Sequence, residues 1–314
     1  MTAFNRTDDD SEAVLRRQRK RLLFWRGIAV AALIVTTLVL FAPARPHPPH
    51  DAIARLEITG VIGNRVRPTV EAIERAERDP HIKAMLLVID SPGGGVTGGE
   101  ALHDAIAGFA SHKPVAVSMQ GLAASAGYMI AVPAQRVFAY PSSITGSIGV
   151  IMMRPDASVL LDHIGVKADA IASGPMKDQS QPFTALKPEG RQMLQGIVDD
   201  LFDQFVLMVA KGRHRSVDEI RQLADGRPYT GRQAVALHLI DQIGDEEQAT
   251  AWLHGQIKGG KGLPVRKLVI ERPGRTMWER LYHRFGGSLF AWPEAIDRMV
   301  AYQSLDGAVS ILPR

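Results

Sequence analysis

The segment Ala84-Met-Leu-Leu-Val-Ile89 is continuously apolar and runs directly into a loop of proline and glycine. A strand without polar positions is typical of a parallel sheet that is buried on both faces. A second apolar run, Val115–Met119, follows after a stretch that predicts a helix near Glu100–Phe109. Strands that alternate with helices in this way predict an α/β fold with a largely parallel sheet.

Other segments continue the same alternation of apolar strands and amphipathic helices. We expect strands at Leu56–Ile62, Arg136–Ala139, Ser147–Ile151 and Lys167–Ile171, and helices at Thr69–Glu77, Leu160–Ile164, Pro188–Lys211, Val217–Leu223 and Gly231–Leu237. The polar segment Ser173–Phe183 is predicted to be a long loop. Together these elements predict a domain over residues 53–252, followed by a C-terminal extension, 253–314, whose role the sequence does not indicate.

The residues before this domain indicate a membrane anchor. Gly27–Phe41 carries no charge, and a cluster of basic residues precedes it: Arg16, Arg17, Arg19, Lys20, Arg21 and Arg26. A helix of about 20 residues spans a bilayer, and flanking basic residues favour the cytoplasmic side. We expect a cytoplasmic tail at 1–21, a transmembrane helix at 22–42 and a proline-rich linker at 43–52. The domain would then lie on the periplasmic or extracytoplasmic side of the bacterial cytoplasmic (inner) membrane.

A cleavable signal peptide is the alternative interpretation of this segment. Ala42-Pro-Ala44 is similar to the small-residue site at which such peptides are cut. The long charged leader and the prolines at 43 and 46 favour an anchor that is retained.

The composition excludes several classes of protein. The chain contains no cysteine, which excludes disulfides, thiolate catalysis and cysteine zinc sites. The net charge of +4 reflects the basic cluster before the apolar run, and the rest of the chain has no recurring basic and aromatic pattern. We therefore expect no nucleic-acid partner. No motif predicts a cofactor or a metal, and we expect neither.

Ser125 is the candidate nucleophile. It lies in Gly121-Leu-Ala-Ala-Ser-Ala-Gly-Tyr128, where a turn of small residues after a strand can aim a hydroxyl at a substrate. Upstream, Ile89-Asp-Ser-Pro-Gly-Gly-Gly95 offers backbone amides that could form an oxyanion hole, and the amides of Gly94 and Ala126 are the candidates. We expect small and apolar residues around Gly121–Met129 to line a substrate groove. The alternative is that the glycines only make a strand-to-helix turn.

A serine hydroxyl needs a base within hydrogen-bond reach, and Lys177 is the candidate. Lysine can act as a base where burial lowers its pKa, and the apolar neighbours Met176 and Phe183 could shield it. A carboxylate would oppose that effect, so we expect Asp178 to point away from the amine. Ser147, in Thr145-Gly-Ser-Ile-Gly149, could orient the lysine without restoring its charge.

Two alternatives to this pairing stay open. Lys177 could be an ordinary surface lysine. A Ser-His-Asp triad could use one of the histidines, of which His103, His112 and His163 are nearest to Ser125 in sequence.

Five motifs, in this order, resemble those of the signal peptide peptidase A (protease IV) family in its short, single-repeat form. They are Asp90-Ser-Pro-Gly-Gly94, Ala123-Ala-Ser-Ala-Gly-Tyr128, Thr145-Gly-Ser-Ile-Gly-Val150, Ser173-Gly-Pro-Met-Lys177 and Gly226-Arg-Pro-Tyr-Thr-Gly-Arg-Gln-Ala234. The resemblance covers residues 56–252. One departure is Ser-Ala-Gly-Tyr where many members have Ser-Gly-Gly-Tyr, which keeps the amide of Ala126 available.

The resemblance implies an α/β fold of the Clp protease/crotonase-like ββα spiral type, with the N-terminal transmembrane helix as a tether. It assigns the nucleophile to Ser125, the general base to Lys177, the lysine-orienting hydroxyl to Ser147 and the oxyanion donors to Gly94 and Ala126. It also implies membrane-tethered homo-oligomeric rings in which the catalytic dyad is completed between neighbouring subunits. The implied substrates are cleaved signal peptides and similar hydrophobic peptides.

Two other functions are compatible with the same motifs. One is a proteolytically inactive, membrane-associated scaffold of the same fold. The other is an acyl-CoA enzyme of the crotonase type, in which the glycine loop would polarise a thioester.

Overall fold

The computed structural model describes residues 21–34, 50–259 and 262–270, and the chain divides into two units after His50. In the first unit a helix covers residues 21–34, and its apolar side chains, among them Leu23, Trp25 and Leu33, are exposed. No helix within the described ranges is both long and apolar enough to cross a membrane. Residues 35–42 of the predicted anchor, the tail at 1–20 and the linker up to 49 lie outside the described residues.

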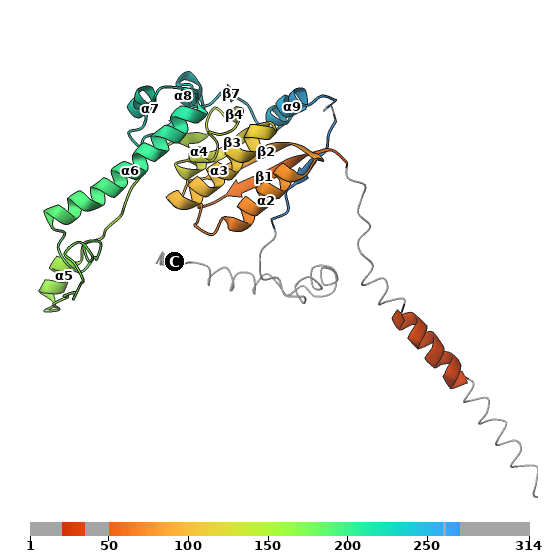
Figure 1. The fold of residues 1–314 in the computed structure, drawn as a ribbon, viewed down its shortest axis with the longest axis horizontal. Coiled ribbons are helices and arrows are strands. Elements are labelled where there is room, and N and C mark those ends of the chain that lie inside the picture. Colours follow the sequence, from red (N-terminus) through yellow and green to blue (C-terminus); the bar gives the residue numbers. More distant parts are fainter. Residues whose placement is uncertain (1–20, 35–49, 260–261, 271–314) are drawn as a thin grey trace, which may run out of the picture. The chain divides into compact units, whose positions relative to one another are not determined.

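The second unit contains an eight-stranded sheet (Figure 1). Its strands are β1 (Ala52–Thr59), β2 (Ile82–Ser91), β3 (Val115–Ala124), β4 (Arg136–Ala139), β5 (Ile144–Gly146), β6 (Pro228–Thr230), β7 (Gln242–Ile243) and β8 (Val265–Lys267). The hydrogen-bonded order is β6-β5-β3-β2-β1-β8, while β4 pairs with β3 and with β7. Only the β5–β6 pair is antiparallel among these strands, so the predicted α/β class with a largely parallel sheet is confirmed.

Helices connect the strands and cover the sheet. In this unit they are α2 (Arg67–Arg78), α3 (Val96–His112), α4 (Ala126–Met129), α5 (Ser158–His163), α6 (Pro188–Gly212), α7 (Val217–Leu223), α8 (Gly231–Ala236) and α9 (Glu246–Gln256).

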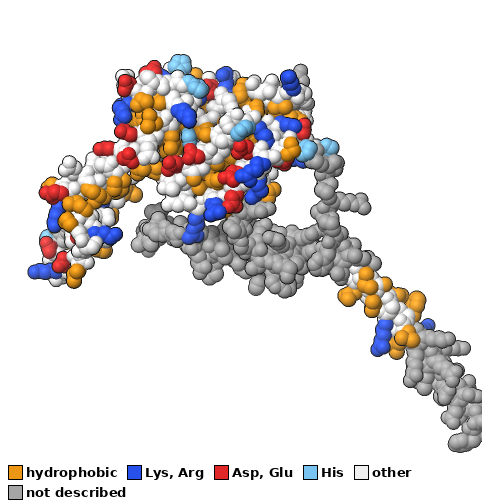
Figure 2. Space-filling model, viewed as in Figure 1, with side chains coloured by type: hydrophobic (Ala, Val, Ile, Leu, Met, Phe, Trp, Pro, Cys, Tyr) orange, Lys and Arg blue, Asp and Glu red, His pale blue; other side chains and the backbone are white. Residues whose placement is uncertain are grey.

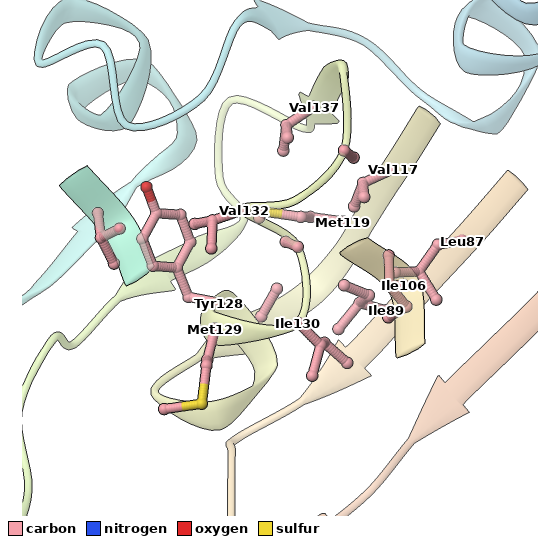
Figure 3. Packing of buried hydrophobic residues seen from close by; sticks show 14 of the residues in the cluster. Leu87, Ile89, Ile106, Val117, Met119, Tyr128, Met129, Ile130, Val132 and Val137 are labelled. Carbon is pink, nitrogen blue, oxygen red and sulfur yellow. The ribbon is translucent and has the colours of Figure 1, made fainter. Parts of the chain in front are cut away.

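The apolar run of β2 explains why both faces of the sheet are covered. Successive side chains of a strand point to opposite faces. Leu87 and Ile89 belong to the larger core cluster with Ile106 of α3, as Figure 3 shows. Leu86 instead belongs to a second cluster on the other face, together with Leu253 of α9. The absence of polar side chains in residues 84–89 of β2 thus reflects two separate cores.

Two of the predicted strands are wrong. The chain leaves the sheet at the end of β5, because Gly146 and Ser147 both have positive φ angles (73° and 49°), so 147–151 form no strand. Residues 167–171 also form no strand. Ile171 is fully exposed, and none of the described strands lies beside this segment to supply hydrogen bonds.

Residues 151–200, which we call the arm, extend away from the sheet (Figure 1). Helix α6 is about 37 Å long at 1.5 Å per residue. Its buried apolar residues, from Phe205 to Ala210, lie in its last third and join the main core. The first part of α6 leaves the core and carries α5 and the loop before α6 at its far end.

The sheet continues beyond the predicted end of the domain at residue 252. That position lies inside α9, and β8 follows it and pairs in parallel with β1. Strand β8 therefore comes from the segment that we assigned to the C-terminal extension, of which residues 271–314 lie outside the described residues.

Candidate functional site

Ser125 stands at the turn between β3 and α4 in an unusual backbone conformation. Its φ and ψ are 53° and −122°, and its side chain is partly exposed. A residue with a side chain is rarely found there, and holding it costs roughly 1–3 kcal/mol. A strained turn from strand to helix is a known way to present a nucleophilic serine.

The buried side chain of Tyr128 anchors helix α4 to the core. The Tyr128 hydroxyl donates a hydrogen bond to the carbonyl of Leu239 at 2.7 Å, and the ring is fully buried. Burial raises the pKa of the Tyr128 phenol far above its ordinary value, so the group is a neutral donor. Figure 3 shows Tyr128 and Met129 within the core, so these two residues do not line the substrate groove that we expected along Gly121–Met129.

The glycine loop lies directly against Ser125. A Cβ on Gly93 would stand 2.7 Å from the Cβ of Ser125 and 3.0 Å from the amide nitrogen of Ala126. A Cβ on Gly94 would stand 2.0 Å from the carbonyl oxygen of Ile62, to which this loop is bridged. A side chain at Gly93 would displace the Ser125 turn, and one at Gly94 would displace the segment around Ile62, so each glycine allows two backbone segments to pack at van der Waals distance.

The two predicted oxyanion donors flank this point of contact. Ala126 is the first residue of α4, and the first amides of a helix have no partner within the helix. Gly94 lies outside the named strands, and the structure records no backbone acceptor for its amide among the residues it describes. Both N–H groups are therefore available to a substrate oxygen.

Ser147 is brought to the same place by the chain leaving β5. The amide of Ser125 donates to the carbonyl of Gly146 at 2.9 Å, so Ser147 follows the residue bonded to the candidate nucleophile. Its own amide donates to the carbonyl of Arg227 at 3.1 Å. The hydroxyls of Ser125 and Ser147 have no recorded hydrogen-bond partner in the part of the chain that is described.

Lys177 lies on the arm and is exposed. Gln179, two residues further on, packs against Gly190, which stands about 22 Å along the α6 axis from Phe205, where α6 joins the core. No described contact joins Lys177 to Ser125, to Ser147 or to the glycine loop. Within one chain, the structure thus brings together four of the five predicted residues and leaves Lys177 apart.

The neighbours of Lys177 differ from the predicted shield. Met176 is 41% exposed and Phe183 is 51% exposed, so neither buries the amine within one chain. The Asp178 carboxylate accepts a hydrogen bond from the Gln179 amide at 3.1 Å, and no ion pair between Asp178 and Lys177 is recorded.

The histidines considered for a triad have other partners. His103 contacts Asp104, His112 contacts Glu77, and His163 contacts the carbonyl of Val159. No described histidine forms a hydrogen bond with Ser125. Among the described residues there is also no group of three or more His, Asp or Glu side chains that could hold a metal ion.

Two residues of the site were missed in the sequence. Gly93 makes the closest approach to Ser125, yet consecutive glycines in the sequence do not show which of them faces the serine. Tyr128 anchors α4 through Leu239, a partner more than a hundred residues away that no local pattern could indicate.

Two family models match the chain. The model described as peptidase family S49 matches residues 107–258, and the model described as Clp protease matches residues 58–148. The first range includes Ser125, Ser147 and Lys177, and the second includes Gly94 and Ser125.

Three relatives are similar to this chain. A Synechocystis protein, named provisionally as a protease, is 38% identical over 200 residues, which cover 64% of this chain and 72% of that protein. "Protease 4" of Salmonella typhi is 39% identical over 58% of this chain but only 30% of its own length. An Enterococcus faecium protein, named provisionally as signal peptide peptidase SppA, is 36% identical over 56% of this chain and 52% of its own length.

These matches agree with the mixed α/β sheet, and they support a serine protease. The chain belongs to peptidase family S49.

Proposed function

We propose that the chain is a serine endopeptidase with a Ser-Lys dyad formed by Ser125 and Lys177. The observation that carries this proposal is the positive φ of Ser125 at the start of α4, directly against the glycine loop. That turn exposes a hydroxyl within reach of two free amides, which is the arrangement that acyl transfer requires.

The chemistry follows from these positions. The Ser125 oxygen attacks the peptide carbonyl carbon while the amine of Lys177 takes the hydroxyl proton. The negative charge that develops on the carbonyl oxygen is stabilised by the N–H groups of Gly94 and Ala126. The C–N bond then breaks, and the leaving amine takes the proton from Lys177. Water, deprotonated by the same lysine, releases the second product and restores Ser125. Ser147 orients the lysine through its hydroxyl.

Lys177 must come from a neighbouring subunit in this proposal. The exposed position of Lys177 on the arm favours a dyad that is completed between chains of a homo-oligomeric ring. Several apolar side chains of the arm are more than half exposed: Ile151, Met153, Val159, Leu160, Ile164, Ile171 and Phe183. Figure 2 shows hydrophobic groups along this part of the surface. Covering them with a neighbour would also remove water from Lys177, and such burial favours a neutral amine.

The substrates, in this proposal, are cleaved signal peptides and similar hydrophobic peptides. Support comes from the resemblance of the motifs and from the name of the Enterococcus relative. We further propose that residues 22–42 anchor the domain to the bacterial cytoplasmic membrane with the domain on the periplasmic or extracytoplasmic side. The uncharged segment 27–41 and the basic cluster before it support this orientation.

The test compares the full-length chain with Ser125→Ala and Lys177→Ala in the cleavage of a synthetic hydrophobic leader peptide. Each variant should lose at least about 10³-fold in kcat/KM. Lys167→Ala, which removes another exposed lysine of the arm, is the matched control and should keep full activity. Full cleavage by either dyad variant would exclude the dyad. No cleavage by the unmodified chain, together with no labelling by a serine-reactive phosphonate, would favour the inactive scaffold.

Mixing the two inactive variants tests the location of the dyad. If each site takes one residue from each of two neighbours, equal mixing should restore about a quarter of the activity, because neighbours assort at random. No recovery in particles shown to contain both variants would place both residues in one chain.

A further inference from the structure

The guanidinium group of Arg154 holds the loop that follows Lys177. Its Nε donates to the carbonyl of Gln179 at 2.9 Å, and its Nη2 donates to the carbonyls of Gln181 at 2.6 Å and Thr184 at 2.5 Å. The side chain is only 10% exposed, although it lies on the arm, where most side chains are open to solvent. One side chain thus fixes three backbone carbonyls of a segment that has no strand or helix to fix them.

Gln179 holds the other side of the same loop. Its amide nitrogen donates to the carbonyl of Pro175 at 2.8 Å, which closes a bridge across Lys177. The side chain is 5% exposed and occupies the space beside Gly190 of α6, where a Cβ would stand 2.1 Å from the Gln179 Oε1. Gly190 therefore leaves the room in which Gln179 is seated.

We infer that Arg154 and Gln179 are positioning residues that set the place of the Lys177 amine before a neighbouring subunit meets it. The inference rests on the proposed role of Lys177 as the base. Both side chains act on the backbone on either side of the lysine, and neither needs to touch the substrate. They are side-chain-to-backbone links of the kind that order a loop in the absence of a core.

The arm needs these hydrogen bonds from side chain to backbone because most of it is not held in place by burial in a core. Apart from Gln179, Gly190 and the nearly buried Arg154 side chain, the residues from 151 to 200 are partly or fully exposed. A lysine side chain has several rotatable bonds, so its amine can take many positions even when the backbone is fixed. Movement of the backbone would widen that range further. A displacement of about 1 Å at a reacting group can lower a rate by about 10²-fold.

The test uses the full-length chain and three substitutions. Arg154→Gln removes the fork of donors, and Gly190→Ala displaces the Gln179 side chain while keeping the Arg154 guanidinium group in the chain. Each should lower kcat by about 10- to 100-fold and leave KM within about twofold, because the substrate groove is built from another region. Arg154→Lys, which can reach fewer carbonyls, should fall between Arg154→Gln and the unmodified chain. Arg67→Gln, which alters an exposed arginine of α2, is the matched control and should not change kcat.

Subunit mixing then assigns the defect to the lysine side of the site. Ser125→Ala has an intact arm, so mixing it with Arg154→Gln should restore activity, whereas mixing Lys177→Ala with Arg154→Gln should not. Recovery with Lys177→Ala instead would place the defect on the serine side and overturn the inference. Unchanged kcat in both Arg154→Gln and Gly190→Ala would also overturn it, and if only Arg154→Gln fails to assemble, Gly190→Ala decides alone.

The failure of this inference differs from the failure of the proposed function. Full activity of Lys177→Ala would overturn both. An inactive Lys177→Ala together with fully active Arg154→Gln and Gly190→Ala would preserve the dyad and reject only the positioning role.

Discussion

The two halves of the candidate site are held in place by different physical means. Around Ser125, buried strands, glycine contacts at van der Waals distance and the buried hydroxyl of Tyr128 fix the backbone. Around Lys177, an arginine and a glutamine bind carbonyl groups on a surface that is largely open to solvent. In the proposed function, the first half is complete within one chain, and the second is completed by a neighbouring subunit.

This difference suggests why the arm is so apolar. Burying one exposed Val, Leu, Ile or Phe side chain contributes about 1.5–3 kcal/mol, and the arm has several such side chains. That free energy is available to an interface between subunits and not to the folding of one chain. Assembly, in the proposed function, would then complete both the fold of the arm and the catalytic site.

The largest expected effect is on the free energy of unfolding. It should appear when one arginine of the sheet region is compared with one arginine of the arm. Arg213 and Asp241, which lie near Tyr128 of α4, form a bidentate ion pair at 2.7 and 3.2 Å, and only 8% of the Arg213 side chain is exposed. Arg213→Gln would leave the Asp241 carboxylate without its charged partner, which should lower the free energy of unfolding by about 3 kcal/mol. Arg154→Gln should leave the same quantity nearly unchanged, because local opening of the arm exposes little core.

Urea denaturation, followed by circular dichroism, measures the free energy of unfolding of both variants at the same protein concentration. Arg78→Gln, in an exposed ion pair of α2, is the control and should change stability by less than about 1 kcal/mol. Equal losses in Arg213→Gln and Arg154→Gln would show that arm and sheet unfold as one unit. The contrast between the two regions would then be rejected.

A second prediction addresses the contact between the glycine loop and Ser125. Gly93→Ala would place a Cβ 2.7 Å from the Ser125 Cβ, and the φ of 105° at Gly93 is also unfavourable for alanine. The displaced hydroxyl should lower kcat by about 10²-fold. Gly108→Ala, in α3, is the matched control, because its nearest neighbour would be the Glu77 carboxylate at 3.7 Å, an ordinary contact. Steady-state cleavage of the leader peptide measures both, and similar kcat values for the two variants would contradict a close-packed turn.

The same contrast explains what the sequence could predict. The apolar run of β2 and the helix pattern of α6 depend on local periodicity, so their type was correct and their ends were close. The turn at Ser125 was also found from its own neighbours, since small residues between a strand and a helix are a local signal. Gly94, Ala126 and Ser147 were also named as candidates from their own glycine-rich segments, and the resemblance of the motifs implied the same residues.

The errors fall where partners lie far away or outside the chain. Residues 167–171 have the composition of a strand, but no strand of the described part of the chain pairs with them. The shield predicted for Lys177 was sought in its sequence neighbours, and those side chains are exposed. The strand β8 was missed because its three residues carry little pattern, and its pairing with β1 is a contact between the ends of the domain.

The smallest expected effect concerns the strain stored at Ser125. Both Ser125→Ala and Ser125→Gly remove the hydroxyl, but only glycine adopts a φ of 53° without a steric cost. Relief of roughly 1–3 kcal/mol of strain is partly offset by the extra freedom of glycine in the unfolded chain, about 0.5–1 kcal/mol. Ser125→Gly should therefore be more stable than Ser125→Ala by about 1 kcal/mol.

Both variants lack the Ser125 hydroxyl, so the difference in stability between them isolates the effect of the backbone. Thermal unfolding at one protein concentration should place the Tm of Ser125→Gly a few degrees above that of Ser125→Ala. A lower Tm for Ser125→Gly would mean that the turn holds a serine without strain. The same pair of substitutions at an unstrained serine of the arm, Ser158→Gly and Ser158→Ala, is the control. Ser158 begins α5 with an ordinary helical backbone, so glycine there only adds freedom to the unfolded chain. At this position the glycine variant should have the lower Tm. The strained backbone at Ser125 is tolerated because contacts with the surrounding sheet hold the turn in place. The arm has no comparable packing.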